Sequence, residues 1–199
     1  MATTISGTSG VTFPAGGTGN PAGTVVGTTD TQTLTNKTLS GATWTSPSGS
    51  TITSGTAVAS TSGTSIDFTG IPSWVKRITV MFNGVSTNGT SNIQIQVGSG
   101  SFTTTGYVSA VSYPTLNTGS TAGLLVFIGG VAVDLRYGII TLCLLGSNIW
   151  TSAGSLTNGS VAETSSGSIA LSGTLDRVRI TTANGTDTFD AGSINILYE

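Results

Sequence analysis

Short runs of alternating apolar and polar residues begin near residue 51 and recur to the end of the chain. Residues 93–97 (IQIQV) and 178–180 (VRI) alternate strictly, which is the period of a half-buried β-strand with one face in water. No stretch has the apolar spacing of an amphipathic helix. The pattern predicts strands at residues 56–59, 65–68, 75–82, 92–97, 106–111, 124–128, 139–145, 168–171, 175–181 and 193–198.

Turn signals separate these runs. Asn-Gly pairs accept the positive φ angles of tight hairpin turns, and they occur at Asn83-Gly84, Asn88-Gly89, Asn158-Gly159 and Asn184-Gly185. Many short strands joined by such turns are typical of antiparallel sandwiches and barrels. The expected fold is therefore all-β, an antiparallel, jelly-roll-like β-sandwich.

Two of the runs are apolar on both faces. Residues 124–128 and 139–145 must be covered on both sides, either by the opposing sheet and a loop or by another subunit. The lone cysteine, Cys143, lies in the second run, where a buried and inert thiol is expected. The surrounding stretch 123–146 is interrupted by Asp134, Arg136 and Tyr137, so we expect strands there and no membrane insertion.

Residues 1–50 have a different composition. They contain three of the five prolines, many Gly-Thr pairs and few large apolar side chains, so they cannot form a core of their own. Two interpretations are open, a flexible tail or an extended segment that becomes ordered on a partner. We take residues 1–50 as an extended attachment segment and 51–199 as a β-sandwich head domain. The isolated apolar residues predicted to anchor the segment are Ile5, Val11, Phe13, Leu34, Leu39 and Trp44.

Charge is scarce throughout the chain. Only 7% of the 199 residues are charged and the formal net charge is −2, against the roughly 25% charged residues of an average protein. Six scattered Lys and Arg residues do not form the basic surface that a nucleic acid requires, so no nucleic-acid partner is expected. The first ten residues, MATTISGTSG, have no basic or apolar stretch typical of a secretory signal. One cysteine excludes an intrachain disulfide, which is compatible with a reducing compartment.

Catalytic chemistry has few candidates. The chain has no histidine, which removes the commonest general base and zinc ligand, and its glycine clusters do not lead into a helix as phosphate-binding loops do. We expect no enzyme activity, no metal and no cofactor. The remaining alternative is a small glycan depolymerase that uses a pair of acids ~5–10 Å apart, one with a raised pKa. Its candidates are Asp134, Glu163, Asp176, Asp187 and Asp190.

Sugar binding is the non-catalytic chemistry that these residue types allow. A pyranose has an apolar face and a rim of hydroxyl groups, so a site needs an aromatic platform beside amide and hydroxyl side chains. The alternative for each aromatic residue is an ordinary place in the core. The candidate receptor contacts are Trp150, Asn148, Thr151, Tyr107 and Tyr113.

Several segments resemble proteins of one kind. Residues 31–43 contain TLTNKTL, which is similar to an element that recurs in tail fibres and related appendages of tailed bacteriophages. Residues 4–14 resemble N-terminal stretches of those proteins. Residues 68–80 are similar to the first strand of the β-rich domains at fibre ends, and residues 194–199 to the way such chains end.

This resemblance implies a parallel homotrimer on a virion, assembled in the host cytoplasm. The N-terminal segment would attach to other virion proteins, and the C-terminal domain would face the medium and bind the host surface, with a cell-surface glycan as the ligand to consider. The chain is short and has no repeated shaft. A capsid decoration or head fibre protein with a mainly stabilising role is therefore the alternative to a tail fibre.

Overall fold

The computed structural model describes residues 52–128 and 131–199, and all of its regular elements are strands. No helix occurs in this described part, as the sequence pattern predicts. Over the same residues no helix is long and apolar enough to cross a membrane. The proposed anchors Ile5, Val11, Phe13, Leu34, Leu39 and Trp44 lie outside the described residues.

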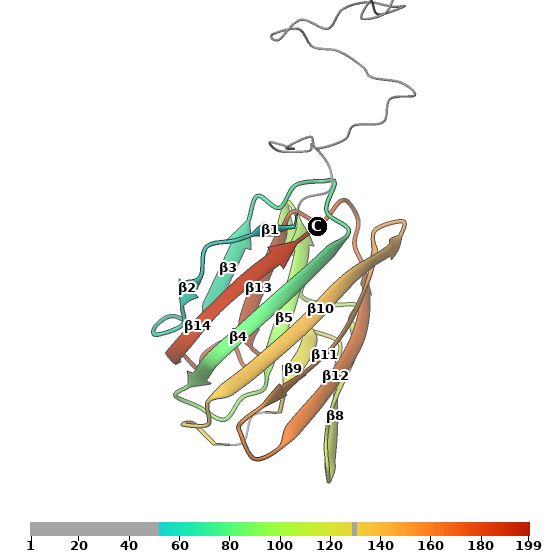
Figure 1. The fold of residues 1–199 in the computed structure, drawn as a ribbon. Coiled ribbons are helices and arrows are strands. Elements are labelled where there is room, and N and C mark those ends of the chain that lie inside the picture. Colours follow the sequence, from blue (N-terminus) through green and yellow to red (C-terminus); the bar gives the residue numbers. More distant parts are fainter. Residues whose placement is uncertain (1–51, 129–130) are drawn as a thin grey trace, which may run out of the picture. The chain divides into compact units, whose positions relative to one another are not determined.

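The strands form two antiparallel sheets that pack face to face as a β-sandwich, with the larger sheet in front of the smaller in Figure 1. The larger sheet has the order β1-β14-β4-β10-β11-β12-β7-β8, with β2 also paired to β14. Its strands are β1 (Thr53–Ser54), β2 (Val58–Ala59), β4 (Arg77–Thr87), β7 (Val108–Tyr113), β8 (Leu116–Ser120), β10 (Arg136–Gly146), β11 (Ile149–Thr157), β12 (Ala162–Ala170) and β14 (Phe189–Tyr198).

The smaller sheet has the order β3-β13-β5-β6, with β9 also paired to β5. Its strands are β3 (Ser65–Thr69), β5 (Ile93–Ser99), β6 (Ser101–Phe102), β9 (Leu124–Phe127) and β13 (Arg177–Thr182). These findings confirm the all-β sandwich. The finer jelly-roll order stays a prediction.

The core lies between the sheets and is filled by alternate residues of each strand. Ile78, Val80 and Phe82 of β4 point inward, opposite Ile95 and other residues of the smaller sheet. Each fully buried aliphatic or aromatic side chain contributes roughly 1.5–3 kcal/mol relative to exposure. This burial fixes the register, because a slip of one residue would turn the apolar set toward water.

Most predicted strands are present, but β8, β11 and most of β12 were missed. β11 was not predicted at all, and β12 was predicted only for its C-terminal end. The two strands read IWTSAGSLT and AETSSGSIA, so small polar residues fill positions where large apolar ones would give a strand signal. Stretch 123–146 forms two strands, β9 and β10, as expected.

The Asn-Gly pairs behave in different ways. Asn158-Gly159 and Asn184-Gly185 form turns with positive φ at the glycine, as predicted. Gly84 of Asn83-Gly84 also has a positive φ, +65°, but the pair lies within β4 as part of a β-bulge and does not form a turn. The register confirms the bulge: Asn83 pairs with Ser193 and Ser86 with Ala191, which leaves two residues of β4 opposite one of β14.

Candidate functional site

The five residues predicted as glycan contacts do not form one site. Trp150 is only 2% exposed and lies in the core, and Tyr107 is also buried. Asn148 lies in the tight turn between β10 and β11, and Thr151 follows on β11. Tyr113 lies at the end of β7, beside the start of β12. Asn148 instead contacts Leu171, just past the other end of β12.

Because both rings are buried, Trp150 and Tyr107 do not form the exposed aromatic platform for a sugar that was expected. The Tyr107 hydroxyl accepts a hydrogen bond from the Val97 amide at 2.9 Å and donates to the Thr103 carbonyl at 2.9 Å. Burial raises the pKa of Tyr107 to about 12, so the hydroxyl stays protonated and engaged with the backbone. Both rings serve packing, which was the alternative for isolated aromatic residues.

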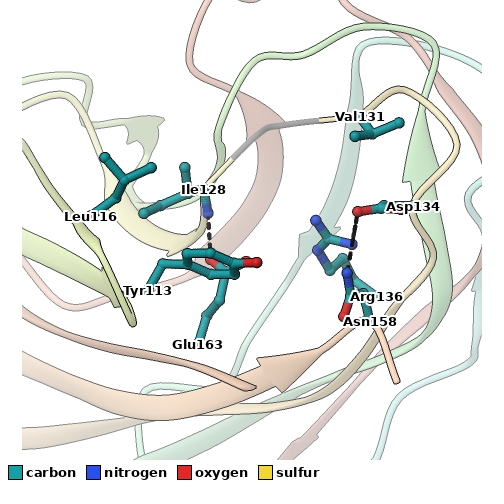
Figure 2. Close-up of a pocket in the computed structure, with 8 residues that line it drawn as sticks. All are labelled: Tyr113, Leu116, Ile128, Val131, Asp134, Arg136, Asn158 and Glu163. Atoms are coloured by element: carbon teal, nitrogen blue, oxygen red, sulfur yellow. Dashed lines mark hydrogen bonds and ion pairs between the residues drawn. The ribbon is translucent and has the colours of Figure 1, made fainter. Parts of the chain in front are cut away.

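Tyr113 does line a pocket, of about 190 Å³. Figure 2 shows the pocket with Tyr113 and Glu163 on one side and Arg136, Asp134 and Asn158 on the other. Its walls come from segments far apart in sequence, namely the end of β7, the start of β8, the residue after β9, the segment just before β10 and its first residue, the β11–β12 turn and β12. The complete lining is Tyr113, Leu116, Ile128, Val131, Asp134, Arg136, Asn158 and Glu163.

Arg136 carries the positive charge of the pocket. Its side chain is 4% exposed, and its guanidinium carbon lies 3.5 Å from the centre of the Phe127 ring. Nη1 lies 3.2 Å from Asp134 Oδ2, an ion pair without hydrogen-bond alignment, and Nε has no hydrogen-bond partner among the described residues. Burial lowers the pKa of Arg136, but a guanidinium keeps its proton at neutral pH.

Two acids of the pocket are held differently. Glu163 is buried, and its Oε2 accepts a hydrogen bond from the Ile128 amide at 2.8 Å. Burial raises the pKa of Glu163, although the Ile128 amide and Arg136 oppose the shift. Asp134 is partly exposed and accepts from Asn158 Nδ2 at 3.2 Å. Asn158 is itself fixed, because its Oδ1 accepts from the amides of Ser160 and Val161 in the turn.

The pocket brings together two of the acids named for glycan cleavage, Asp134 and Glu163. The others lie elsewhere: Asp176 pairs with Arg177, Asp187 accepts from Asn184, and Asp190 accepts from Ser86. Among the described residues no group of three His, Cys, Asp or Glu side chains is placed to hold a metal ion. The sequence held one signal for this site, since Asp134 and Arg136 interrupt an apolar run in a chain with few charges.

A second feature is the side of the larger sheet that faces away from the core. On β10, Ile140 and Leu142 point inward, whereas Tyr137, Ile139, Cys143 and Leu145 are exposed, with Ile139 at 50% and Leu145 at 74%. The expectation of a buried Cys143 is therefore wrong, because Cys143 lies at one of the positions of β10 whose side chains point away from the core. We call the outward residues of β10, β11, β12 and β7 the outer face.

The outer face carries no charged residue. The charged residues of its four strands, Arg136 and Glu163, both point inward. Next to the large side chains of β10, the neighbouring strands present mostly small or hydroxyl groups, among them Thr151, Ala153, Ser155, Thr164, Ser166 and Ala110, together with the exposed Val108. An uncharged surface with short side chains can approach another surface closely.

The two apolar runs thus differ in how they are covered. All four residues of β9 are buried within the chain, as in a central strand of a sandwich. β10 is covered only on its inner side. Comparisons of the chain with protein-family models, curated proteins and solved structures give no match.

Proposed function

We propose that this chain is a structural, non-enzymatic subunit of a tailed-bacteriophage particle, and that copies of it associate through the outer face. The observation that carries the proposal is the exposed apolar row on β10, which continues into the uncharged outward residues of β11, β12 and β7 and is bordered on the other side by Arg77 of β4. The TLTNKTL segment and the other fibre-like segments support the particle assignment.

Copies of the same chain are the occupant that the outer face favours. Ile139 and Leu145 leave apolar area in water, and soluble proteins seldom keep such patches without a partner. The adjacent Ala, Ser and Thr side chains are short, so the outer faces of neighbouring copies can approach each other closely. With no charge on the face, burial requires no ion to lose its hydration.

Three copies are proposed, because the resembling fibre proteins are parallel trimers. Closed symmetry buries the same patch on every subunit, which is the usual way for identical chains to cover a shared apolar surface. Residues 1–50 would then attach the trimer to other virion proteins. Both a tail fibre and a capsid decoration or head fibre protein are compatible with this arrangement.

The particle assignment is tested on virions. We expect an antibody against the full chain to detect it in gradient-purified particles made from the genome that encodes it. Electron microscopy of the labelled particles separates the two placements: label on the tail indicates a tail fibre, and label over the shell a decoration or head fibre protein. Purified particles that contain no copy of the chain would refute the assignment.

A further inference from the structure

We propose that the pocket around Arg136 is a binding site for a single neutral sugar residue. The site lies within one chain and away from the outer face residues of β10, so it does not depend on the assembly proposed above. It names a ligand class for a cavity that the structural role of the subunit does not require.

The first reason is an unmet hydrogen bond. Arg136 lines the pocket, and its buried Nε and Nη1 have no hydrogen-bond partner among the described residues. A buried donor without a partner destabilises the protein, and a ligand oxygen that hydrogen-bonds to this guanidinium would offset that cost. Asp134 and Glu163 are acceptors in the same pocket. The ligand must therefore both accept and donate hydrogen bonds, as a sugar hydroxyl does.

The second reason is charge. One guanidinium and two carboxyl groups give the pocket a formal charge of −1 when both acids are ionised. A ligand carboxylate or phosphate would gain the Arg136 contact but would be repelled by the two acids. Arg136 in turn opposes a cation, and Phe127 already occupies one face of its guanidinium. A neutral hydroxylated ligand avoids both penalties.

The third reason is shape. Leu116, Ile128 and Val131 form apolar walls around the polar groups, and Tyr113 adds an aromatic ring with a hydroxyl. A pyranose offers an apolar C–H face to such walls and hydroxyl groups to the polar floor. The volume of about 190 Å³ is below the roughly 300–1,000 Å³ of sites for drug-sized ligands, which fits one ring and not an oligosaccharide.

The test is saturation-transfer difference NMR on the full chain with methyl glycosides of glucose, galactose and N-acetylglucosamine, beside galacturonate as an acidic probe. We expect at least one neutral glycoside to bind with a millimolar dissociation constant and galacturonate to bind at least fivefold more weakly. No signal from any neutral glycoside, or stronger binding of galacturonate, would overturn the proposal.

Variants locate the binding. Leu116→Ala changes an exposed wall residue, and Glu163→Gln removes a charge at nearly constant shape; each is expected to weaken binding at least fivefold. Tyr198→Phe, which alters a tyrosine outside the pocket, is the matched control and should leave binding unchanged. Equal binding by Leu116→Ala and the parent chain, with a parental melting curve, would place the ligand elsewhere and overturn the proposal.

A reducing-end assay on oligosaccharides of the bound sugar completes the experiment. We expect no release of reducing ends. Release that Glu163→Gln abolishes would overturn the binding role in favour of cleavage by Asp134 and Glu163. These outcomes concern the pocket of a single chain, so they do not test the assembly proposal. The mass of the full chain in solution tests that proposal.

Discussion

At the scale of single residues, the few charges of the chain are used mostly in pairs. Arg179 makes two hydrogen bonds to Asp67, at 2.8 and 2.7 Å, across strands β13 and β3. Arg177 pairs with Asp176, and Arg77 with Glu199. These pairs are exposed, so solvent screening leaves each with little effect on stability. Arg136, which pairs with Asp134, is the buried exception.

Glu163 should make the stability of the protein depend on pH. Its pKa in the folded protein is raised by burial above that of the unfolded chain, so folding favours the protonated acid. The contribution is fully present below the unfolded pKa, about 4.3, and is lost as the pH rises through the raised value. We therefore expect the Glu163→Gln variant to lack this pH-dependent loss of stability when urea unfolding is measured at a series of pH values across that range.

Asp187 provides the control of opposite sign. Hydrogen bonds from Asn184 and the Ser91 amide lower its pKa, so its contribution is present above the ordinary pKa and is lost as the pH falls through the lowered value. Asp187→Asn should therefore weaken the pH dependence on the acid side only. A Glu163→Gln variant with the same pH profile as the parent chain would contradict the account of Glu163.

Trp150 should behave as a core residue. We expect Trp150→Ala to lower the free energy of unfolding by about 3–5 kcal/mol, because it removes a fully buried ring. Trp74→Ala, at a more exposed tryptophan, should cost much less. Urea unfolding followed by circular dichroism measures both. Equal losses in the two variants would contradict the placement of Trp150 in the core.

The sequence could not separate these roles at single positions. Trp150 lies in the β10–β11 hairpin beside Asn148 and Thr151, which suggested a polar site, and only the parity of β11 turns its ring inward. The same parity turns Cys143 outward, against the burial habit of free cysteines. Composition near a residue does not reveal the direction of its side chain until the strand and its register are known.

At the scale of elements, the bulge between β4 and β14 shifts the alternation of β4. Phe82 faces the core before the bulge and Val85 faces it after the bulge, so the alternation of inward and outward side chains shifts by one residue. The bulge requires a close approach between Gly84 and Gly192. Gly192 has φ +88°, and a Cβ there would lie 2.3 Å from the Gly84 carbonyl oxygen.

Gly192→Ala should therefore be more costly than an ordinary glycine replacement. Gly185→Ala is the matched control, because Gly185 also has a positive φ, +68°, but open space around its Cβ position. The control should lose about 1–2 kcal/mol from backbone strain alone. Gly192→Ala should lose about 1–3 kcal/mol more from the clash, measured by urea unfolding. Equal losses would contradict the tight bulge.

The strength of the apolar signal decides which elements could be predicted. Strands such as β5, β9 and β13 carry Val, Ile or Leu at alternate or successive positions and were found. β11 and β12 carry Ser, Gly and Ala instead, and tertiary pairing with β10 and β7 makes them strands. The pocket was not predictable either, since it joins the ends of several elements whose neighbours depend on the strand order.

At the scale of the whole molecule, the sandwich buries one face of its larger sheet and leaves the outer face open. The sequence already indicated that strand 139–145 needs cover on both sides, with the opposing sheet or another subunit as alternatives. The structure covers β9 within the chain but leaves Ile139 and Leu145 of β10 in solvent. The proposed association of identical chains would explain both this difference and the lack of charge on the outer face.

The mass of the full chain in solution, measured by multi-angle light scattering at micromolar concentration, tests this association most directly. We expect a trimer, and we expect the double variant Ile139→Asp with Leu145→Asp to be a folded monomer, because each subunit would then bury unpaired charges. Val133→Asp, at a residue 76% exposed and outside the outer face, is the control and should remain a trimer. A monomeric parent chain, or a double variant that stays trimeric, would contradict assembly through the outer face.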